Sequence, residues 1–388
     1  MTAVVAGHCE DRFSSLRTLL ERSLDSGADV GASVCVSVAG EVVVDLHGGR
    51  MGEHDHRPWS AETIVNVYSV TKPMTALAVL LLVDRGELEL DAPVSRYWPQ
   101  FAAAGKDGVE VGHLLSHTSG VSGWAEPITL EQLYDTEQAA QRLAGQPPWW
   151  PPGTRSGYHA LSYGHLLAEL VRRVTGTSLG RFFAAELAAP LGADFHIGTP
   201  AEHADRVAAL VPPPAMPSQG TAWDPDSIAA RTLTNPVVPV SATSTPGWRG
   251  AEIGAAGGHG NARSVARLHA LFSGRGESAG VRLLSEPTVR AALRPRSRGT
   301  DLVLGASLRF GAGLAVGPAA AVPAVPDGEV CWWAGFGGSL VVSDLDRELT
   351  LAYVPNAMEP GLLNPSRGNA LLAATYTALG EPSGSATG

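Results

Sequence analysis

"NVYSVTKPMTAL", residues 66–77, contains one of only two lysines in the chain, three residues after Ser69 and at the head of an apolar run. Proline is not tolerated deep inside a helix, so a helix that includes Pro73 must begin just before it, near Ser69. Residues i and i+3 of a helix share one face. The spacing therefore predicts that the Lys72 ammonium and the Ser69 hydroxyl lie together at a helix N-terminus.

Two roles fit this pair. A helix N-terminus stabilises negative charge, which suits an alkoxide forming on Ser69, and a desolvated Lys72 can act as a base. Alternatively, Ser69 caps the helix while Lys72 reaches past apolar side chains to water. A Ser-x-x-Lys pair arises by chance too easily in a chain of 388 residues to decide between these roles.

The composition excludes several function classes. A net charge of -10 argues against nucleic-acid binding, which needs a basic face, and there are no Lys/Arg clusters to attract anionic lipid. The three cysteines, Cys9, Cys35 and Cys331, lie outside any CxxC motif, which favours a reducing compartment over a disulfide framework or zinc site.

The chain opens without a signal-like segment, and its apolar run 74–83 is too short to span a bilayer. We therefore expect a soluble, cytoplasmic protein that acts on a small molecule and binds neither nucleic acid nor membrane. The sequence leaves its oligomeric state open.

Both ends of the chain carry strand patterns. A helical pattern over 13–27 is followed by a β-branched hairpin pattern over 32–49, and strand-like runs cover 308–317 and 329–356 before a closing helix. We predict one sheet domain formed by residues 1–93 together with 262–388. Residues 94–261 are expected to be an inserted, mostly helical domain. Its segment 211–250 has too many prolines for a helix or central strand, so we expect a long loop at the rim of the substrate pocket.

Two further motifs accompany Ser69 and Lys72. "PPGTRSGYHALSYG" (151–164) places Tyr158 after a Pro-Gly turn and before a helical patch. "CWWAGFGGSLVV" (331–342) is a strand-like run with three glycines, which mark close approach by a backbone or ligand. Backbone N–H groups on such a strand edge can form an oxyanion hole.

Taken in order, these motifs resemble the S-x-x-K, Y-x-N and K-T-G signatures of the serine β-lactamase/penicillin-binding-protein superfamily. Within it, the chain is similar to the class C β-lactamase-like esterases, the family VIII carboxylesterases, from about residue 15 to 378. Further similar stretches are 67–101, "VGHLLSHTSGV" (111–121) and 251–274. The resemblance implies an α+β fold of the β-lactamase/transpeptidase type, with a mainly antiparallel sheet flanked by helices and a largely helical domain.

The chain departs from the signatures at two places. Tyr158-His159-Ala160 has alanine where the family has an amide or hydroxyl, and Trp333-Ala334-Gly335 stands where lactamases have K-T-G. The cation that grips the carboxylate of a β-lactam is therefore missing. A tryptophan offers an apolar wall suited to an ester or acyl group, so we do not expect efficient β-lactamase activity.

The resemblance implies a serine esterase for small to medium acyl groups, without metal or cofactor. Ser69 would carry the acyl group, and the backbone N–H groups of Ser69 and Phe336 would bind the oxyanion. Either Tyr158 takes the serine proton beside the Lys72 ammonium, or a neutral Lys72 is the base and Tyr158 the shuttle. Substrate contacts are expected from Trp333, Gly335, His159, Trp150 and Trp124.

Other functions could use the same residues. An acyltransferase, an amidase or D-peptidase, and a weak β-lactamase are enzymatic alternatives, and a penicillin-recognising sensor is a non-enzymatic one. His113 and His117 have a metal-compatible spacing, but Leu114 stands where zincins have glutamate. We therefore assign both histidines to structure and predict no metal site.

Overall fold

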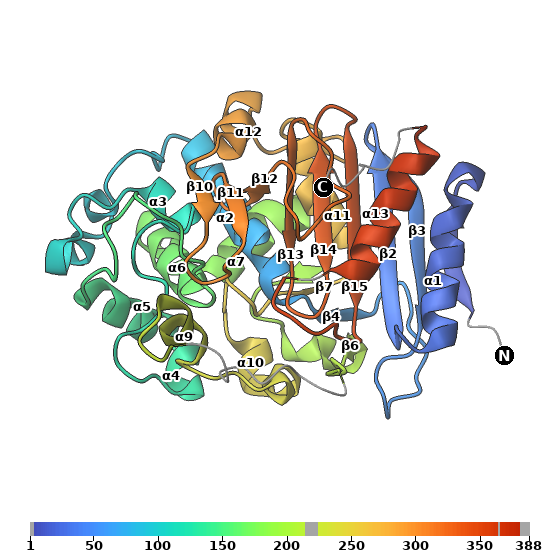
Figure 1. Cartoon of the computed structure of the whole chain (residues 1–388), viewed down its shortest axis with the longest axis horizontal. Coiled ribbons are helices and arrows are strands. Elements are labelled where there is room, and N and C mark those ends of the chain that lie inside the picture. The colour runs from blue at the N-terminus through green and yellow to red at the C-terminus, as the bar shows by residue number, and fades with distance from the viewer. Residues whose placement is uncertain (1–3, 214–223, 364, 381–388) are drawn as a thin grey trace.

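The computed structural model describes residues 4–213, 224–363 and 365–380. Within these residues, nine strands form one sheet in which every neighbouring pair is antiparallel (Figure 1). From one edge to the other, the strands are β1 (Val5–Cys9), β3 (Glu41–Gly49), β2 (Gly31–Val38), β15 (Leu349–Pro355), β14 (Leu340–Asp344), β13 (Val330–Ala334), β12 (Ala315–Val316), β11 (Ser307–Phe310) and β10 (Ser297–Thr300).

The sheet joins the two ends of the chain. β2 and β3 form the expected hairpin, in which Ala39 and Gly40 both have positive φ, as a tight two-residue turn requires. β2 then pairs with β15 from the C-terminal part, with Cys35 opposite Ala352. One sheet built from both chain ends was expected, and the strand order confirms it.

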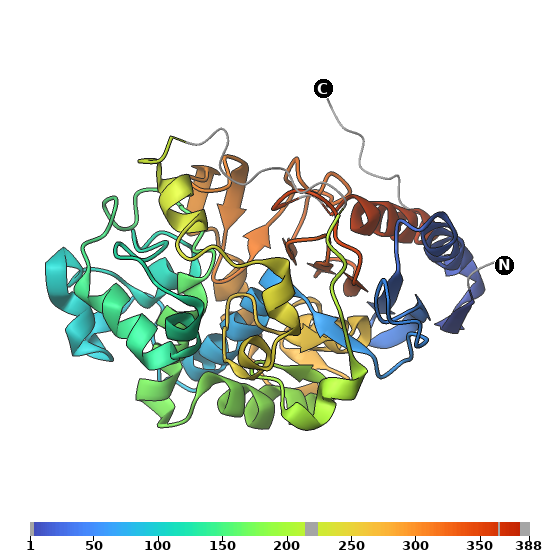
Figure 2. The ribbon, with the colours of Figure 1, turned by 90° about the horizontal axis from the view of Figure 1, so that it is seen from below.

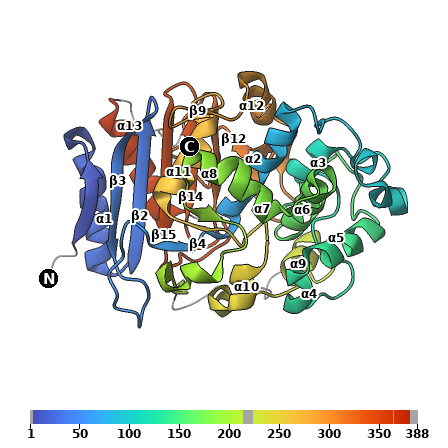
Figure 3. The ribbon, with the colours of Figure 1, turned by 180° about the vertical axis from the view of Figure 1, so that it is seen from behind.

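Helices cover both faces of the sheet. α1 (Ser14–Ser26) and α13 (Ser366–Ala378) lie side by side on one face, and α11 (Ala262–Ser273) lies on the other (Figures 1 and 3). Side chains along β15 alternate accordingly: Leu351 packs on the α1 and α13 side, and Ala352 on the α11 side. The mainly antiparallel sheet flanked by helices is therefore confirmed.

A largely helical region occupies the other end of the molecule (Figure 2). α2 (Thr71–Asp84) is apolar on all sides and buried from Thr71 to Leu82, so it forms the centre of this region's core. That core continues to Val341 and Val354 of the sheet. The boundaries of the two predicted domains stay a prediction. The helical region and the sheet share this core. The region's other helices are α3 (Val111–Leu115), α4 (Leu130–Tyr134), α5 (Thr136–Gly145), α6 (Ser162–Thr175), α7 (Leu179–Phe183) and α8 (Ala189–Leu191).

Smaller elements complete the fold. A second sheet contains β5 (Phe195–His196), β7 (His259–Gly260), β4 (Ile64–Asn66) and β6 (Val207–Ala208), β8 (Glu277–Ser278) pairs with β9 (Val281–Arg282), and α12 (Glu286–Leu293) precedes β10. No helix among the described residues combines the length and apolar character needed to cross a bilayer.

The proline-rich segment 211–250 differs from the expectation of a loop without helices. Its described part contains α9 (Ile228–Leu233) and α10 (Pro246–Gly250), and 214–223 lie outside the described residues. Pro246 occupies the first turn of α10, where the missing N–H costs nothing, and Thr245 caps it. Residues 224–250, yellow in Figure 2, run across the middle of the molecule in that view.

Candidate active site

Ser69 lies in a single 3-10 turn (Tyr68–Val70) that leads directly into α2. The segment 254–258 holds this turn: the Val67 N–H donates to the Gly258 carbonyl, and the Asn66 side chain donates to the Ala256 carbonyl. Tyr68 has φ 45, a left-handed conformation unusual for a bulky residue, directly before the half-buried Ser69. A strained, well-anchored backbone therefore presents the serine hydroxyl at the start of α2.

Lys72 lies one turn further along α2 and is 1% exposed. Its Nζ is 3.3 Å from the Oγ of Ser69 and donates to the carbonyls of Ala160 (2.8 Å) and Ala255 (3.0 Å). Burial lowers the pKa of Lys72 well below its ordinary value. A snorkelling lysine would reach water, so the alternative role for Lys72 is wrong.

Tyr158 approaches from the segment that precedes α6. Its phenol donates a hydrogen bond of 2.6 Å to the Oγ of Ser69, and the Nζ of Lys72 lies 4.5 Å from the centre of its ring. Burial raises the pKa of Tyr158, and its hydrogen bond with Ser69 offsets only part of that rise. The structure thus brings the hydroxyl, the amine and the phenol into one constellation.

The turn after β13 packs against the turn that carries Ser69. The N–H of Phe336 finds no acceptor within the described part of the chain, and the Phe336 ring packs edge-on against Tyr68 at 5.3 Å. A Cβ on Gly335 would lie 2.3 Å from the Val67 carbonyl oxygen, so only glycine permits this approach. Gly335 therefore sets the distance between the Phe336 turn and the Ser69 turn.

Three of the remaining residues predicted to contact substrate are buried around Tyr158 and its loop. Trp333 is buried and packs against the ring of Tyr158 at 5.4 Å. His159 is fully buried and bonds the hydroxyl of Ser119, and Trp150 donates to the Arg155 carbonyl and packs on His159. These three side chains support Tyr158 and its loop.

Trp124 lies in the core of the helical region. Its indole N–H donates to the Ala139 carbonyl of α5, and its ring contacts His165 of α6. The structure therefore gives Trp124 a packing role in that core.

Sequence reasoning missed two residues that contact the tyrosine segment. His117, assigned only to structure, lies 5.0 Å from the Tyr158 ring, and Asp301 accepts a hydrogen bond from the Tyr158 N–H. The "HTSG" stretch (117–120) lay in a segment similar to the family, but nothing marked Asp301. Within the described residues, no group of three or more His, Cys, Asp or Glu side chains could hold a metal ion.

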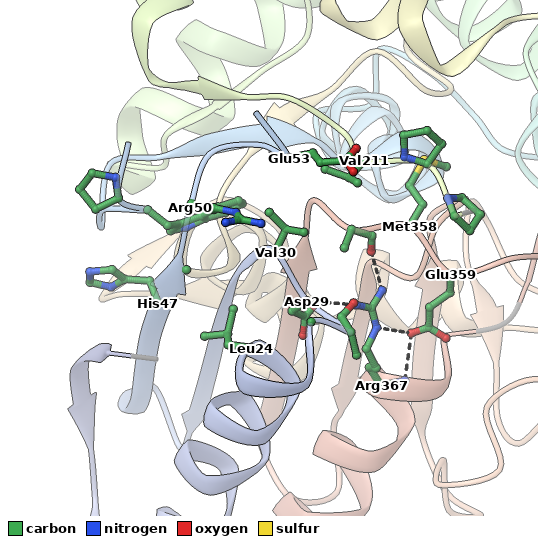
Figure 4. A pocket seen from close by; sticks show the side chains of 18 of the residues that line it. Leu24, Asp29, Val30, His47, Arg50, Glu53, Val211, Met358, Glu359 and Arg367 are labelled. Atoms are coloured by element: carbon green, nitrogen blue, oxygen red, sulfur yellow. Dashed lines mark hydrogen bonds and ion pairs between the residues drawn. The ribbon is translucent and has the colours of Figure 1, made fainter. Parts of the chain in front are cut away.

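A large cavity of about 1490 Å³ does not have Ser69 among its lining residues. Figure 4 shows it between the end of α1, the start of α13 and the segment around Val211. A buried network of Arg367 with Asp29 and Glu359 borders it. A Cβ added to Gly337, beside Phe336, would lie 2.8 Å from Met358 on the cavity wall. Among the described residues that line this cavity there is no lysine and no tyrosine.

Comparisons with known proteins agree with this architecture. A model of the family described as beta-lactamase matches residues 16–375. The esterase/beta-lactamase LipL of Mycobacterium tuberculosis is 32% identical over 371 residues, which cover 91% of this chain and 83% of LipL.

Two solved structures have nearly the same fold over nearly the whole chain. A family VIII carboxylesterase gives a TM-score of 0.90 at 34% identity, covering 97% of this chain and 100% of its own. A penicillin-binding protein homologue from Caulobacter crescentus gives 0.89 at 35% identity with the same coverage. The resemblance read from the three motifs is confirmed: the chain belongs to the beta-lactamase family, whose members similar to it include esterases.

Proposed function

We propose that this protein is a carboxylesterase that cleaves esters of small to medium acyl groups through an acyl-enzyme on Ser69. The observation that carries the proposal is the meeting of a phenol, 2.6 Å away, and an amine, 3.3 Å away, at one serine hydroxyl. Esterase activity in the names of LipL and the carboxylesterase relative supports the same reaction class.

Lys72 is the base in this proposal. A neutral amine has two N–H groups and one lone pair, and Nζ faces two carbonyl oxygens and the Ser69 hydroxyl. The N–H groups satisfy the carbonyls, which leaves the lone pair for the serine proton. The direction of both pKa shifts supports this assignment, because burial favours neutral Lys72 and a protonated Tyr158 phenol.

The reaction then proceeds in two steps. Ser69 Oγ bonds to the ester carbonyl carbon as its proton passes to Lys72, and the N–H groups of Ser69 and Phe336 stabilise the oxyanion. The ester C–O bond breaks, the leaving alkoxide takes the phenol proton of Tyr158, and Lys72 returns a proton to Tyr158. Water then attacks the carbonyl carbon of the acyl-enzyme and gives a proton to Tyr158, whose own proton passes to Lys72. The bond to Ser69 Oγ breaks, Lys72 returns the proton to Oγ, and the acid is released.

Esters fit this site better than β-lactams. The cation that binds a lactam carboxylate is replaced by buried Trp333, and the chain's other lysine, Lys106, is buried against the carbonyls of Ala103 and Gln146. A neutral ester needs no cation and therefore loses no binding interaction at this site, whereas a lactam carboxylate lacks its lysine partner.

The test is a series of p-nitrophenyl esters, from acetate to dodecanoate, measured beside nitrocefin on wild type and Ser69→Ala. We expect turnover that favours the shorter acyl chains, little nitrocefin hydrolysis, and fluorophosphonate labelling of wild type alone. Turnover by Ser69→Ala at the wild-type rate would refute the mechanism. An added alcohol acceptor measures how the acyl-enzyme divides between hydrolysis and transfer.

A further inference from the structure

Three consecutive backbone N–H groups around Tyr158 each have a buried acceptor. The N–H of Gly157 donates to the His117 carbonyl (2.9 Å), and the N–H of His159 donates to Nδ1 of the His117 ring (3.2 Å). Between them, the N–H of Tyr158 donates to Oδ1 of Asp301 (3.0 Å). The two acceptor residues are 2% and 1% exposed and come from distant parts of the chain.

We propose that His117 and Asp301 are positioning residues that hold this backbone so that the Tyr158 phenol reaches Ser69. The inference rests on the shuttle role proposed above for Tyr158. Neither residue touches the reacting atoms. Each accepts hydrogen bonds from the backbone of residues 157–159, and the His117 ring also packs on Tyr158.

The backbone of His117 makes its double contact possible. Its φ of 62 lies in the left-handed region, which a bulky residue adopts rarely and at a cost. In this conformation its carbonyl and its ring nitrogen reach the two neighbours of Tyr158 at once. Its ring also packs on Tyr158 (5.0 Å) and on Phe310 of β11 (4.9 Å).

The contact requires a neutral imidazole. Nδ1 can accept from the His159 N–H only when the ring proton is on Nε2, because a protonated ring donates at both nitrogens. Burial, and then the nearby His159 and Lys72, lower the pKa of His117 well below its ordinary value. The ring therefore keeps its acceptor.

Asp301 fixes the same segment from the edge of the sheet. It lies between β10 and β11, and its Oδ1 also accepts from the N–H groups of Val303 and Leu304 (both 2.9 Å). The Leu302 N–H donates to the Ser156 carbonyl (2.9 Å). The tyrosine segment is thus bound to the sheet by Asp301 and to the end of α3 by His117.

Two substitutions of His117 separate positioning from packing. Asparagine tolerates the left-handed conformation and can place an amide oxygen where Nδ1 lies, but it removes the ring volume. Leucine keeps apolar volume and removes the acceptor. If the acceptor positions Tyr158, His117→Asn keeps activity that His117→Leu loses, whereas a packing role gives the opposite order.

The measurement is kcat and KM with p-nitrophenyl butyrate, together with circular dichroism and Tm. We expect kcat to fall at least about tenfold in His117→Leu with KM nearly unchanged, since small misplacements of catalytic groups cost this much or more. His117→Asn should stay within about threefold of wild-type kcat. His269→Leu is the control, because His269 is equally buried on α11 and bonds Ser343, and it should lower Tm but not kcat.

A second pair covers the case in which His117→Leu does not fold. Asp301→Asn keeps an acceptor oxygen and should retain kcat, and Asp301→Ala should lose it by a similar factor. Wild-type kcat in His117→Leu and Asp301→Ala, or equal losses in His117→Asn and His117→Leu, overturns the inference. If Ser69→Ala is inactive in the same assays, such a result removes only the positioning role; if Ser69→Ala stays active, the proposed function itself has failed.

Discussion

The two lysines of the chain are both buried, yet only one faces a hydroxyl. Lys106 donates to the carbonyls of Ala103 and Gln146, and burial lowers its pKa to about 8. Lys72 faces two carbonyls and the Oγ of Ser69. The neighbouring serine, and not burial alone, makes Lys72 the candidate base.

Lys72→Met tests this difference, with Lys106→Met as its matched control. Methionine keeps most of the apolar volume but cannot take the serine proton, so we expect kcat to fall by about 10²–10⁴-fold, the range of general acid–base catalysis. Lys106→Met should reduce stability and leave kcat nearly unchanged. The measurement is ester hydrolysis with a urea melt of each variant; equal kcat losses at both positions would contradict the assignment.

The pH profile of kcat/KM gives an independent check. The base acts when neutral, so activity should fall as pH drops through the lowered pKa of Lys72, at a pH below the ordinary lysine value of 10.5. Because burial raises the pKa of the Tyr158 phenol, activity should not decline at the alkaline end. Rates measured from about pH 5 to about pH 10 should therefore rise to a plateau, or lie on it throughout if the Lys72 pKa falls below this range. A midpoint near 10.5 would contradict a lowered Lys72 pKa.

At the scale of elements, the site depends on how closely the end of β13 approaches the turn before α2. Gly335 makes this contact with the carbonyl of Val67. The two N–H groups proposed for the oxyanion hole belong to Phe336, directly after Gly335, and to Ser69, two residues after Val67. A shift between the two elements moves one N–H relative to the other. The geometry of the proposed oxyanion hole therefore depends on how the two elements pack.

Gly335→Ala should separate the two elements. Its Cβ would lie 2.3 Å from the Val67 oxygen, so the backbone must move, and we expect kcat to fall by about 10²-fold. Gly108→Ala is the control, because that glycine is exposed, has no atom near its Cβ position and needs no positive φ. The measurement is kcat and Tm of both variants. A wild-type kcat in Gly335→Ala would show that the contact between Gly335 and Val67 has no role in catalysis.

Sequence patterns predicted the elements best where periodicity is strong. The 13–27 helix, the 32–49 hairpin and the strands up to 356 all formed. β1 gave no signal because it is an edge strand with its middle residues exposed, so neither alternation nor apolar content marked it. Residues 69, 72 and 158 could be found because the spacing of the first two suggested chemistry and the three motifs together resembled the family. The contacts of His117 and Asp301 could not, since they depend on tertiary packing between segments far apart in the chain.

At the scale of the whole molecule, a buried charge network joins the two chain ends. Arg367, at the start of α13, pairs with Asp29 before β2 and with Glu359 after β15, and all three side chains are largely buried. The same network borders the large cavity (Figure 4). Removing the one cation leaves two carboxylates buried without it.

Arg367→Met should lower the free energy of unfolding by about 3–5 kcal/mol, the cost of breaking a buried ion pair. Arg12→Met breaks the exposed pair with Glu10 and should cost no more than about 1 kcal/mol. Urea denaturation of both variants gives the comparison. Equal losses would mean that the buried network does not hold the chain ends together.

The order of strands in the sheet also determines when the sheet can close during synthesis. Gly31, at the start of β2, hydrogen-bonds the side chain of Asn356, which lies 325 positions later. During synthesis the hairpin of β2 and β3 keeps one edge uncovered until residues up to 356 have left the ribosome. Such long-range closure is slow, and the waiting edge is open to wrong partners. Chaperones that shield this edge during translation should therefore raise the yield of active protein.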